Sequence, residues 1–288
     1  SFVNRHNFAA YMEMTMGLPL GMLFAGAVVR DKRLLYITGI ALMGVALIMS
    51  GSRGGLVAFL AQVIFLIMLT TGAKSRKRLV MRIGFATLLI AAVIVGSIFI
   101  GGESSLTRIA DTATSNDITT DRGHIWSVTT SVIAKTMPFG AGFGALGVAY
   151  TPYDSYSGLE RVEQAHNDYL QVAADAGLVG IVIGLFFLLW LFRSGLAGAN
   201  ADNHYRRGVA IGAMAGCFAV LVHSIFDFVL HTTAISLLFI LLMTLIVACR
   251  QRYDDDFELP EWQKRRAYAP KSSLASISDA RRGNASLK

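Results

Sequence analysis

Hydrophobic runs long enough to cross a bilayer dominate the pattern of this chain. A membrane-spanning helix needs about 20 mainly apolar residues. Runs of about this length lie at 8–29, 34–50, 56–72, 79–100, 169–192, 208–230 and 233–249. Glycines recur at close spacing, such as Gly208, Gly212 and Gly216, which lets membrane helices approach closely. The pattern therefore predicts an all-α polytopic membrane protein, with about seven transmembrane helices within residues 1–250.

Composition agrees with this class. The chain is 54% hydrophobic and only 16% charged, with a mean hydropathy of +0.53, whereas about a quarter of the residues of a soluble domain are charged. The two cysteines, Cys217 and Cys249, both lie in apolar runs, so no disulfide framework is predicted. An ordinary soluble protein is excluded.

The basic residues divide unequally between the two sets of connections. Twenty of the 26 Lys and Arg residues fall on one set: residues 30–33, 74–82, 193–207 and the tail from 250. Basic residues mark the cytoplasmic side of membrane proteins. Their position beside anionic lipid headgroups also explains the net charge of +7 without nucleic acid.

This asymmetry predicts a topology. Residues 1–7, the turn at 51–55, the loop at 101–167 and the turn near 231 are expected on the outer face. The polar tail, residues 251–288, is expected to be cytoplasmic and disordered.

The outer loop is too long for a passive connection. Its residues 121–137 predict an amphipathic helix at the membrane surface, with Asp121 as N-cap and Arg122 in the first turn. One face of this helix would carry Ile125, Val128, Val132, Ile133 and Met137.

A glycine-rich stretch follows, and it contains the spacing G-x-G-x-x-G at Gly142, Gly144 and Gly147. No βαβ unit surrounds it, which argues against a dinucleotide site. The stretch instead favours a glycine-rich turn whose backbone can pack against or approach a substrate.

Three polar residues on the predicted outer face are candidates for one site. Arg53 lies between two spans beside glycines, where its guanidinium group can bind phosphate, although it can also be an interfacial residue that reaches to the headgroups. Arg122 can likewise bind phosphate, or it can be a surface charge paired with Asp117 or Asp121. His166 suits a general base near neutral pH, or a capping or buried structural histidine.

Ionisable residues within the spans form a second group. His223, Asp227 and His231 are spaced i, i+4, i+8 in the sixth run, which predicts a stripe on one helix face. Such groups are costly in a membrane and are usually functional or paired. The stripe indicates a brace for the site or a contact to Arg53 more than a metal site. Glu13 in the first run is similar, with a helix–helix hydrogen bond as the alternative.

Several short motifs together resemble the O-antigen ligase/polymerase superfamily over about residues 2–249. They are Phe2-Val3-Asn4-Arg5-His6-Asn7, Ser52-Arg53-Gly54-Gly55, Arg122 with Trp126, Phe139-Gly140-Ala141-Gly142-Phe143-Gly144, His166-Asn167-Asp168-Tyr169-Leu170-Gln171, and His223-Ser224 with Asp227-Phe228. The resemblance implies a GT-C-like bacterial inner-membrane glycosyltransferase with a periplasmic active face. Members of that superfamily have ten to twelve spans, so further helices are expected before Ser1.

The resemblance also implies roles for individual residues. Arg53 and Arg122 match the arginines that hold the diphosphate of an undecaprenyl-diphosphate-linked glycan donor, and His166 matches the histidine that acts on the acceptor hydroxyl. Fixed guanidinium groups stabilise the negative charge of a leaving diphosphate, so no metal or other cofactor is expected. The implied substrate-binding residues are Arg5, His6, Asn167, Tyr169, His223 and Asp227.

Several alternatives remain open from the sequence. The acceptor can be another glycan, the lipid A core or a protein hydroxyl. A transporter or flippase for lipid-linked sugars would place its polar groups near the midplane of the bilayer. A non-catalytic envelope assembly subunit would tolerate replacement of Arg53, Arg122 or His166.

Overall fold

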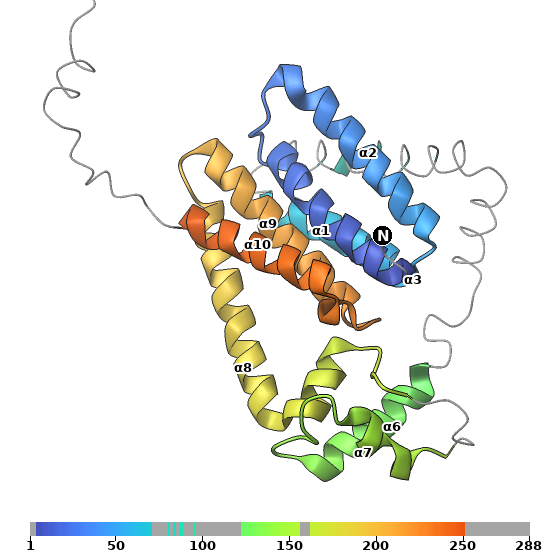
Figure 1. The fold of residues 1–288 in the computed structure, drawn as a ribbon. Helices are drawn as coiled ribbons and strands as arrows, with labels where there is room; N and C mark the ends of the chain where they lie inside the picture. The colour runs from blue at the N-terminus through green and yellow to red at the C-terminus, as the bar shows by residue number, and fades with distance from the viewer. Residues whose placement is uncertain are drawn as a thin grey trace, which may run out of the picture. The chain divides into compact units, whose positions relative to one another are not determined.

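Helices make up the regular structure of the described part of the chain. The computed structural model describes residues 4–70, 122–155 and 162–250, together with isolated helical positions between 80 and 95 (Figure 1). The predicted span at 79–100, the loop residues 101–121 and the tail therefore lie mostly or wholly outside the described residues. The described α-helices are α1 Arg5–Phe24, α2 Arg33–Ser50, α3 Arg53–Thr70, α6 Arg122–Thr136, α7 Leu146–Tyr150, α8 Asp168–Ala199, α9 His204–His223 and α10 Thr233–Arg250.

Three short 3-10 helices complete this part of the chain: Arg30–Lys32, Thr151–Tyr153 and Val229–His231. Five described segments are long and apolar enough to cross a membrane: residues 30–50, α3, α8, α9 and α10. The all-α polytopic class is thus supported. The sequence predicts about seven spans, and the described residues contain five candidates. Helix α1 is not among the five.

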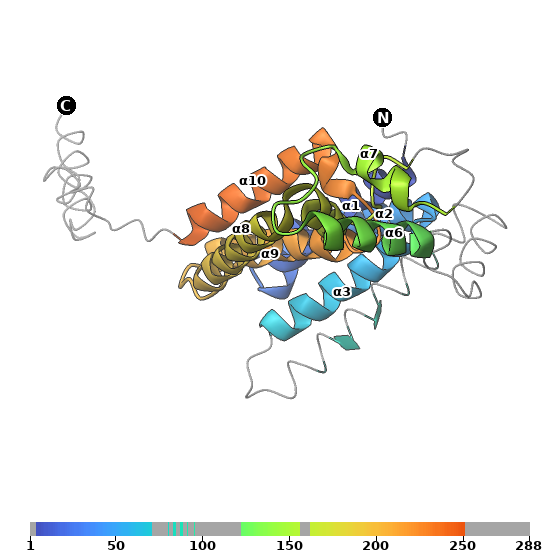
Figure 2. The same ribbon diagram turned by 90° about the horizontal axis from the view of Figure 1, so that it is seen from below.

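The centre of the bundle is the pair α1 and α9, and α9 also contacts α3, α8 and α10 (Figure 2). The two backbones approach so closely that a Cβ on Gly21 would lie 2.2 Å from the Cα of Gly212. Gln62 of α3 closes the packing, because its Nε2 donates to the carbonyls of Glu13 and Ala215 at 3.0 and 3.2 Å. The close approach predicted from small residues is confirmed.

Helix α8 bends sharply at Gly177, where φ is 59° and ψ is −146°. Side chains other than hydrogen are strongly disfavoured in this conformation. A Cβ there would also lie 2.2 Å from the carbonyl oxygen of Pro138. The next residue, Leu178, donates its backbone N–H to that same carbonyl at 2.8 Å. The bend separates residues 168–176, which meet the outer helices α6 and α7, from the apolar segment 178–199 (Figure 1).

The outer helices pack on the first part of α8 through a small apolar cluster of Val132, Leu146, Ala165 and Ala174. Helix α6 confirms the helix predicted at 121–137, although Asp121 lies outside the described residues. The glycine-rich stretch packs its backbone on α8, because Ala141 N donates to Ala174 O at 2.7 Å and Gly142 N to Asp175 O at 3.0 Å. The glycine-rich stretch thus forms a turn that lies against α8, while its contact with a substrate stays a prediction.

The prediction for the sixth span was wrong at its end. Helix α9 ends at His223 and not near residue 230, because the chain turns there and the N–H groups of Phe226 and Asp227 both donate to His223 O. Apolar residues continue beyond this turn, so their pattern did not mark it. His223, Asp227 and His231 therefore form no stripe on one helix face, and each contacts a different partner.

We predict that Gly177→Ala lowers the free energy of unfolding by about 1–3 kcal/mol, because alanine must adopt a conformation that disfavours a Cβ. Gly184→Ala in the same helix is the matched control, since nothing lies within 4 Å of its Cβ position. This control should be neutral or stabilising by about 0.5–1 kcal/mol. Thermal unfolding of the purified proteins in detergent measures both, and equal stability of the two variants would contradict the role of the bend.

Candidate active site

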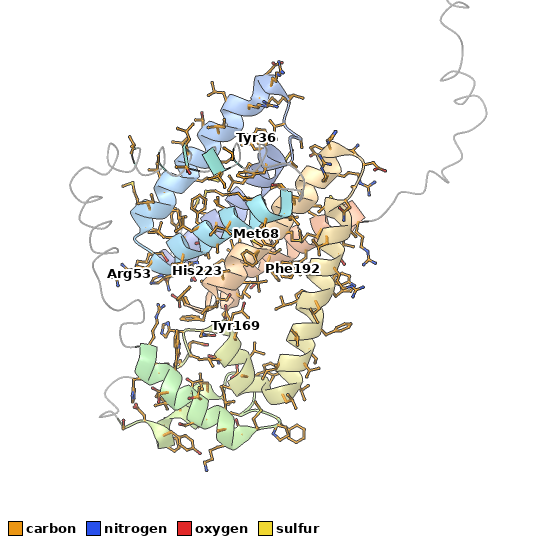
Figure 3. All side chains as sticks on the ribbon, turned by 180° about the vertical axis from the view of Figure 1, so that it is seen from behind. Tyr36, Arg53, Met68, Tyr169, Phe192 and His223 are labelled. Carbon is orange, nitrogen blue, oxygen red and sulfur yellow. The ribbon has the colours of Figure 1, made fainter. Side chains whose placement is uncertain are left out.

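A polar cavity of about 170 Å³ lies where α1, α3, α6 and the turn after α9 meet. Its lining holds three guanidinium groups and, among the described residues, no carboxylate. The cavity is therefore suited to an anion. Figure 3 shows Arg53 at the end of the bundle that also holds His223 and Tyr169, whereas Tyr36 lies toward the other end. The lining residues are Arg5, His6, Gly51, Arg53, Gly54, Arg122 and Phe226.

Each of the three arginines is the first residue of a helix: Arg5 of α1, Arg53 of α3 and Arg122 of α6. Helix N-termini carry partial positive charge and unpaired N–H groups. Side-chain caps fix two of these ends. Asn4 accepts from the N–H of His6 at 2.8 Å, and the hydroxyl of Ser52 accepts from the N–H of Gly55 at 3.2 Å. The positive ends of three helices thus add to the guanidinium charges at one cavity.

The starts of α1 and α3 are also joined to each other. Nδ1 of His6 lies 2.9 Å from the hydroxyl of Ser52, which is itself fully buried. This hydrogen bond holds Arg5 and Arg53 beside the same space. The structure thus brings Arg53 and Arg122 of the predicted three-residue site to one cavity, together with Arg5 and His6, whereas His166 is not among the residues that line it.

Asp227 is the carboxylate beneath this cavity, and its side chain is almost fully buried. Its Oδ2 lies 3.2 Å from Nη2 of Arg122, and its Oδ1 lies 3.2 Å from Nδ1 of His166. Arg122 donates a second hydrogen bond, from Nη1 to the carbonyl of Phe226. The N–H of Phe228 donates to Oδ1 at 2.9 Å. One carboxylate therefore positions both the arginine and the histidine that the sequence singled out.

The charge of Asp227 follows from these contacts. Burial raises the pKa of this carboxyl, but the hydrogen bond with His166 and the positive charge of Arg122 outweigh that effect and hold the pKa below its usual range. Asp227 is therefore ionised at neutral pH and can accept a hydrogen bond from Nδ1–H of His166.

His166 is held in a strained backbone conformation, with φ at 49°. The side chain is 37% exposed, and its ring lies edge-on to Phe228 with 4.9 Å between ring centroids. When Nδ1–H donates this hydrogen bond to Asp227, the lone pair of the neutral ring is on Nε2. This is the arrangement that a general base needs.

A second buried pair lies behind the cavity. Glu13 and His223 are both inaccessible to solvent, and His223 Nδ1 lies 3.1 Å from Glu13 Oε1. A Cβ on Gly55 would lie 2.7 Å from that carboxylate, and a Cβ on Gly54 would lie 3.3 Å from His223 Nε2. The two glycines after Arg53 therefore make room for this pair. His223 lies behind Gly54 and does not line the cavity.

Asn167 and Tyr169 bind the protein itself. Asn167 caps α8 and donates from Nδ2 to the carbonyl of Ile225 at 2.9 Å, while the hydroxyl of Tyr169 donates to Leu221 O at 2.7 Å. These contacts attach the start of α8 to the end of α9 and the turn that follows it.

Asp168 makes structural contacts to the turn after α9 that the sequence did not predict. Its carboxylate accepts from the N–H of Leu230 at 3.2 Å and contacts Nδ1 of His231 at 2.9 Å. The hydrogen bond with Asp168 raises the pKa of His231 above its ordinary value. The sequence shows only an acidic residue in the first turn of a helix, and this pattern does not identify His231 as its partner.

The described residues contain no group of three His, Cys, Asp or Glu side chains that could hold a metal ion. A larger, apolar cavity of about 530 Å³ begins at Asp168 and Tyr169 and follows α8. Its apolar lining includes Ile181, Leu185, Phe187 and Phe239.

Several basic residues lie together at the other end of the bundle. Arg207 donates to the carbonyl of Ala25 just after α1, and Arg206 donates to Cys249 O at 3.2 Å. Arg250 donates to Ser194 Oγ at 3.1 Å. These residues gather where α1 and α10 end and α9 begins, at the opposite end from Arg5 and His223.

We predict that Asp227→Asn lowers the free energy of unfolding by about 1–3 kcal/mol at pH 7, because Arg122 loses its charged partner. A lowered pKa stabilises the folded state above the unfolded value, here close to 3.8, and that contribution disappears as the pH falls through the lower folded value. Thermal unfolding across pH should therefore show a constant difference from wild type between pH 5 and 8. The difference should narrow only below about pH 4, and narrowing near pH 6 would assign the effect to another group.

Comparison with known proteins adds the family. A search of curated proteins found no match. The family model described as O-antigen ligase matches residues 38–185, just over half of the chain, and the matched range includes Arg53, Arg122 and His166. The chain belongs to the O-antigen ligase family.

Proposed function

We propose that this chain carries the active site of a bacterial inner-membrane glycosyltransferase. It transfers or polymerises a glycan taken from an undecaprenyl-diphosphate-linked donor at the periplasmic face. The observation that carries the proposal is the joining of the arginine-lined cavity to His166 through the single carboxylate of Asp227. Family membership supports ligase or polymerase chemistry in general.

The arginines bind the diphosphate of the donor. Arg5, Arg53 and Arg122 line a cavity of about 170 Å³, and each stands at a helix N-terminus. Charge-assisted hydrogen bonds from guanidinium groups suit phosphate oxygens. When the bond between the sugar and the diphosphate breaks, negative charge grows on the diphosphate, and fixed positive groups stabilise that transition state.

His166 activates the acceptor. Nε2 takes the proton of the acceptor hydroxyl as its oxygen attacks the anomeric carbon, and the bond from that carbon to the diphosphate breaks. Asp227 holds the ring through Nδ1 and stabilises the imidazolium that forms. The acceptor is a hydroxyl of another glycan, of the lipid A core or of a protein.

The polyprenyl chain of the donor needs an apolar environment, and the cavity of about 530 Å³ along α8 provides one near Asp168 and Tyr169. The orientation rests on the basic residues: Arg206, Arg207 and Arg250 gather at the opposite end of the bundle from the arginine-lined cavity. The positive-inside rule then assigns the arginine-lined cavity to the periplasm and the C-terminal tail to the cytoplasm.

The test uses the full-length protein in liposomes with an undecaprenyl-diphosphate-linked oligosaccharide and each class of acceptor in turn. Release of undecaprenyl diphosphate should depend on an acceptor. We predict that His166→Ala and Arg122→Ala each lower that release by about 10²–10⁴-fold, through loss of the base and of the transition-state charge. The productive acceptor names the subclass.

The matched controls are His204→Ala and Arg193→Ala, which lie outside the cavity lining and should keep the wild-type rate. If His166→Ala and Arg122→Ala leave the release of undecaprenyl diphosphate unchanged, the assignment of these residues to the active site is refuted. A protein that moves the donor lipid across the bilayer without releasing the diphosphate would be a transporter instead.

A further inference from the structure

The loop between α6 and α7 exposes two large aromatic side chains. Phe143 is 91% exposed and Phe139 is 76% exposed. Isolated apolar residues on a surface are common, but two phenylalanines this exposed within one short loop favour a partner that removes them from water. Met137 and Val148, which flank the loop, are exposed as well.

The backbone of this loop is held in place, so the exposure belongs to a defined conformation. Gly140 N donates to Thr136 O at 3.0 Å, and Ala141 N donates to Ala174 O at 2.7 Å. The carbonyl of Pro138 accepts from Leu178 N at 2.8 Å. The loop is therefore bound to α8 on both sides of the bend at Gly177.

These contacts also fix the depth of the loop. Residues 178–192 of α8 form the uninterrupted apolar segment between the bend and Arg193, and at ~1.5 Å per residue they measure about 23 Å. The long side chain of Arg193 can extend further toward the headgroups on the other side. Leu178 is the first residue of this segment, so a backbone bonded to it lies at the boundary of the hydrocarbon core. The exposed apolar side chains of Leu178, Val182 and Phe186 continue from that boundary along α8.

The other exposed part of α6 has the opposite character. Ser127, Thr130 and Ser131 form its exposed polar side, and the hydroxyls of Thr130 and Ser131 donate to the backbone carbonyl of Ser127. The exposed apolar residues of this region thus gather after residue 136, next to the bend of α8.

We propose that Phe139 and Phe143 insert into the outer boundary of the lipid bilayer and anchor α6 and α7 to the membrane surface. The partner is a lipid surface, because the loop continues the lipid-facing side of α8 at the point where that helix enters the bilayer. Aromatic side chains suit this interface. The anchor fixes the height of α6, and with it Arg122 at the other end of that helix. The inference is independent of the proposed glycosyl transfer.

The test places an environment-sensitive fluorophore on single cysteines. Phe139→Cys and Phe143→Cys are made in a background in which the buried Cys217 and Cys249 are alanine, and the full-length protein is reconstituted in vesicles of phosphatidylethanolamine and phosphatidylglycerol. We predict blue-shifted emission at both positions, and quenching by lipids that carry a nitroxide near the headgroup. Because the vesicles hold no other protein and no donor lipid, a positive result identifies the bilayer as the partner.

Two sets of controls give the emission and quenching expected in water and in the bilayer interior. Ser127→Cys and Ser131→Cys on the polar side of α6 should emit as in water, and Leu185→Cys on α8 should be quenched most by nitroxides deep in the acyl chains. Thermal unfolding confirms that each variant folds. Water-like, unquenched emission from positions 139 and 143 beside a quenched position 185 would overturn the anchor, whatever the transferase assay shows.

Discussion

One buried carboxylate organises the functional end of this protein. Asp227 binds Arg122, His166 and the backbone N–H of Phe228, and thereby connects α6, the start of α8 and the turn after α9. An ionised carboxylate in such surroundings is costly unless it is fully hydrogen-bonded. The partners supply that compensation, and Arg122 and His166 are also the groups to which the proposed glycosyl transfer assigns donor binding and proton transfer. Stability and function are therefore coupled at this residue.

The packing of the bundle explains why arginines line the cavity while the protein beneath it is tightly packed. Helices α1 and α9 touch backbone to backbone at Gly21 and Gly212, which leaves little room for large side chains between them. Toward the outer end, the space behind Gly54 and Gly55 is filled by the buried pair Glu13 and His223. These glycines keep α3 close to the pair, so that Arg53 stands at a helix start with a solid support beneath it.

Much of this arrangement was predictable because it depends on local pattern. Hydrophobic runs predicted the long helices, and the charge asymmetry placed Arg53, Arg122 and His166 on one face, where the structure brings the two arginines into one cavity and joins His166 to it through Asp227. The end of α9 was missed because apolar residues continue past a turn set by tertiary hydrogen bonds. Asp168 with His231, and Glu13 with His223, pair residues that are 63 and 210 positions apart, and no local period encodes such a partner.

Asp227 is synthesised after both of the side chains that it holds, Arg122 and His166. Asp227 follows Arg122 by 105 residues and His166 by 61. A nascent chain that ends between residues 166 and 226 therefore holds the arginine and the histidine without the carboxylate that contacts both. The contacts that join Arg122 to His166 can form only when the turn before α10 has been made.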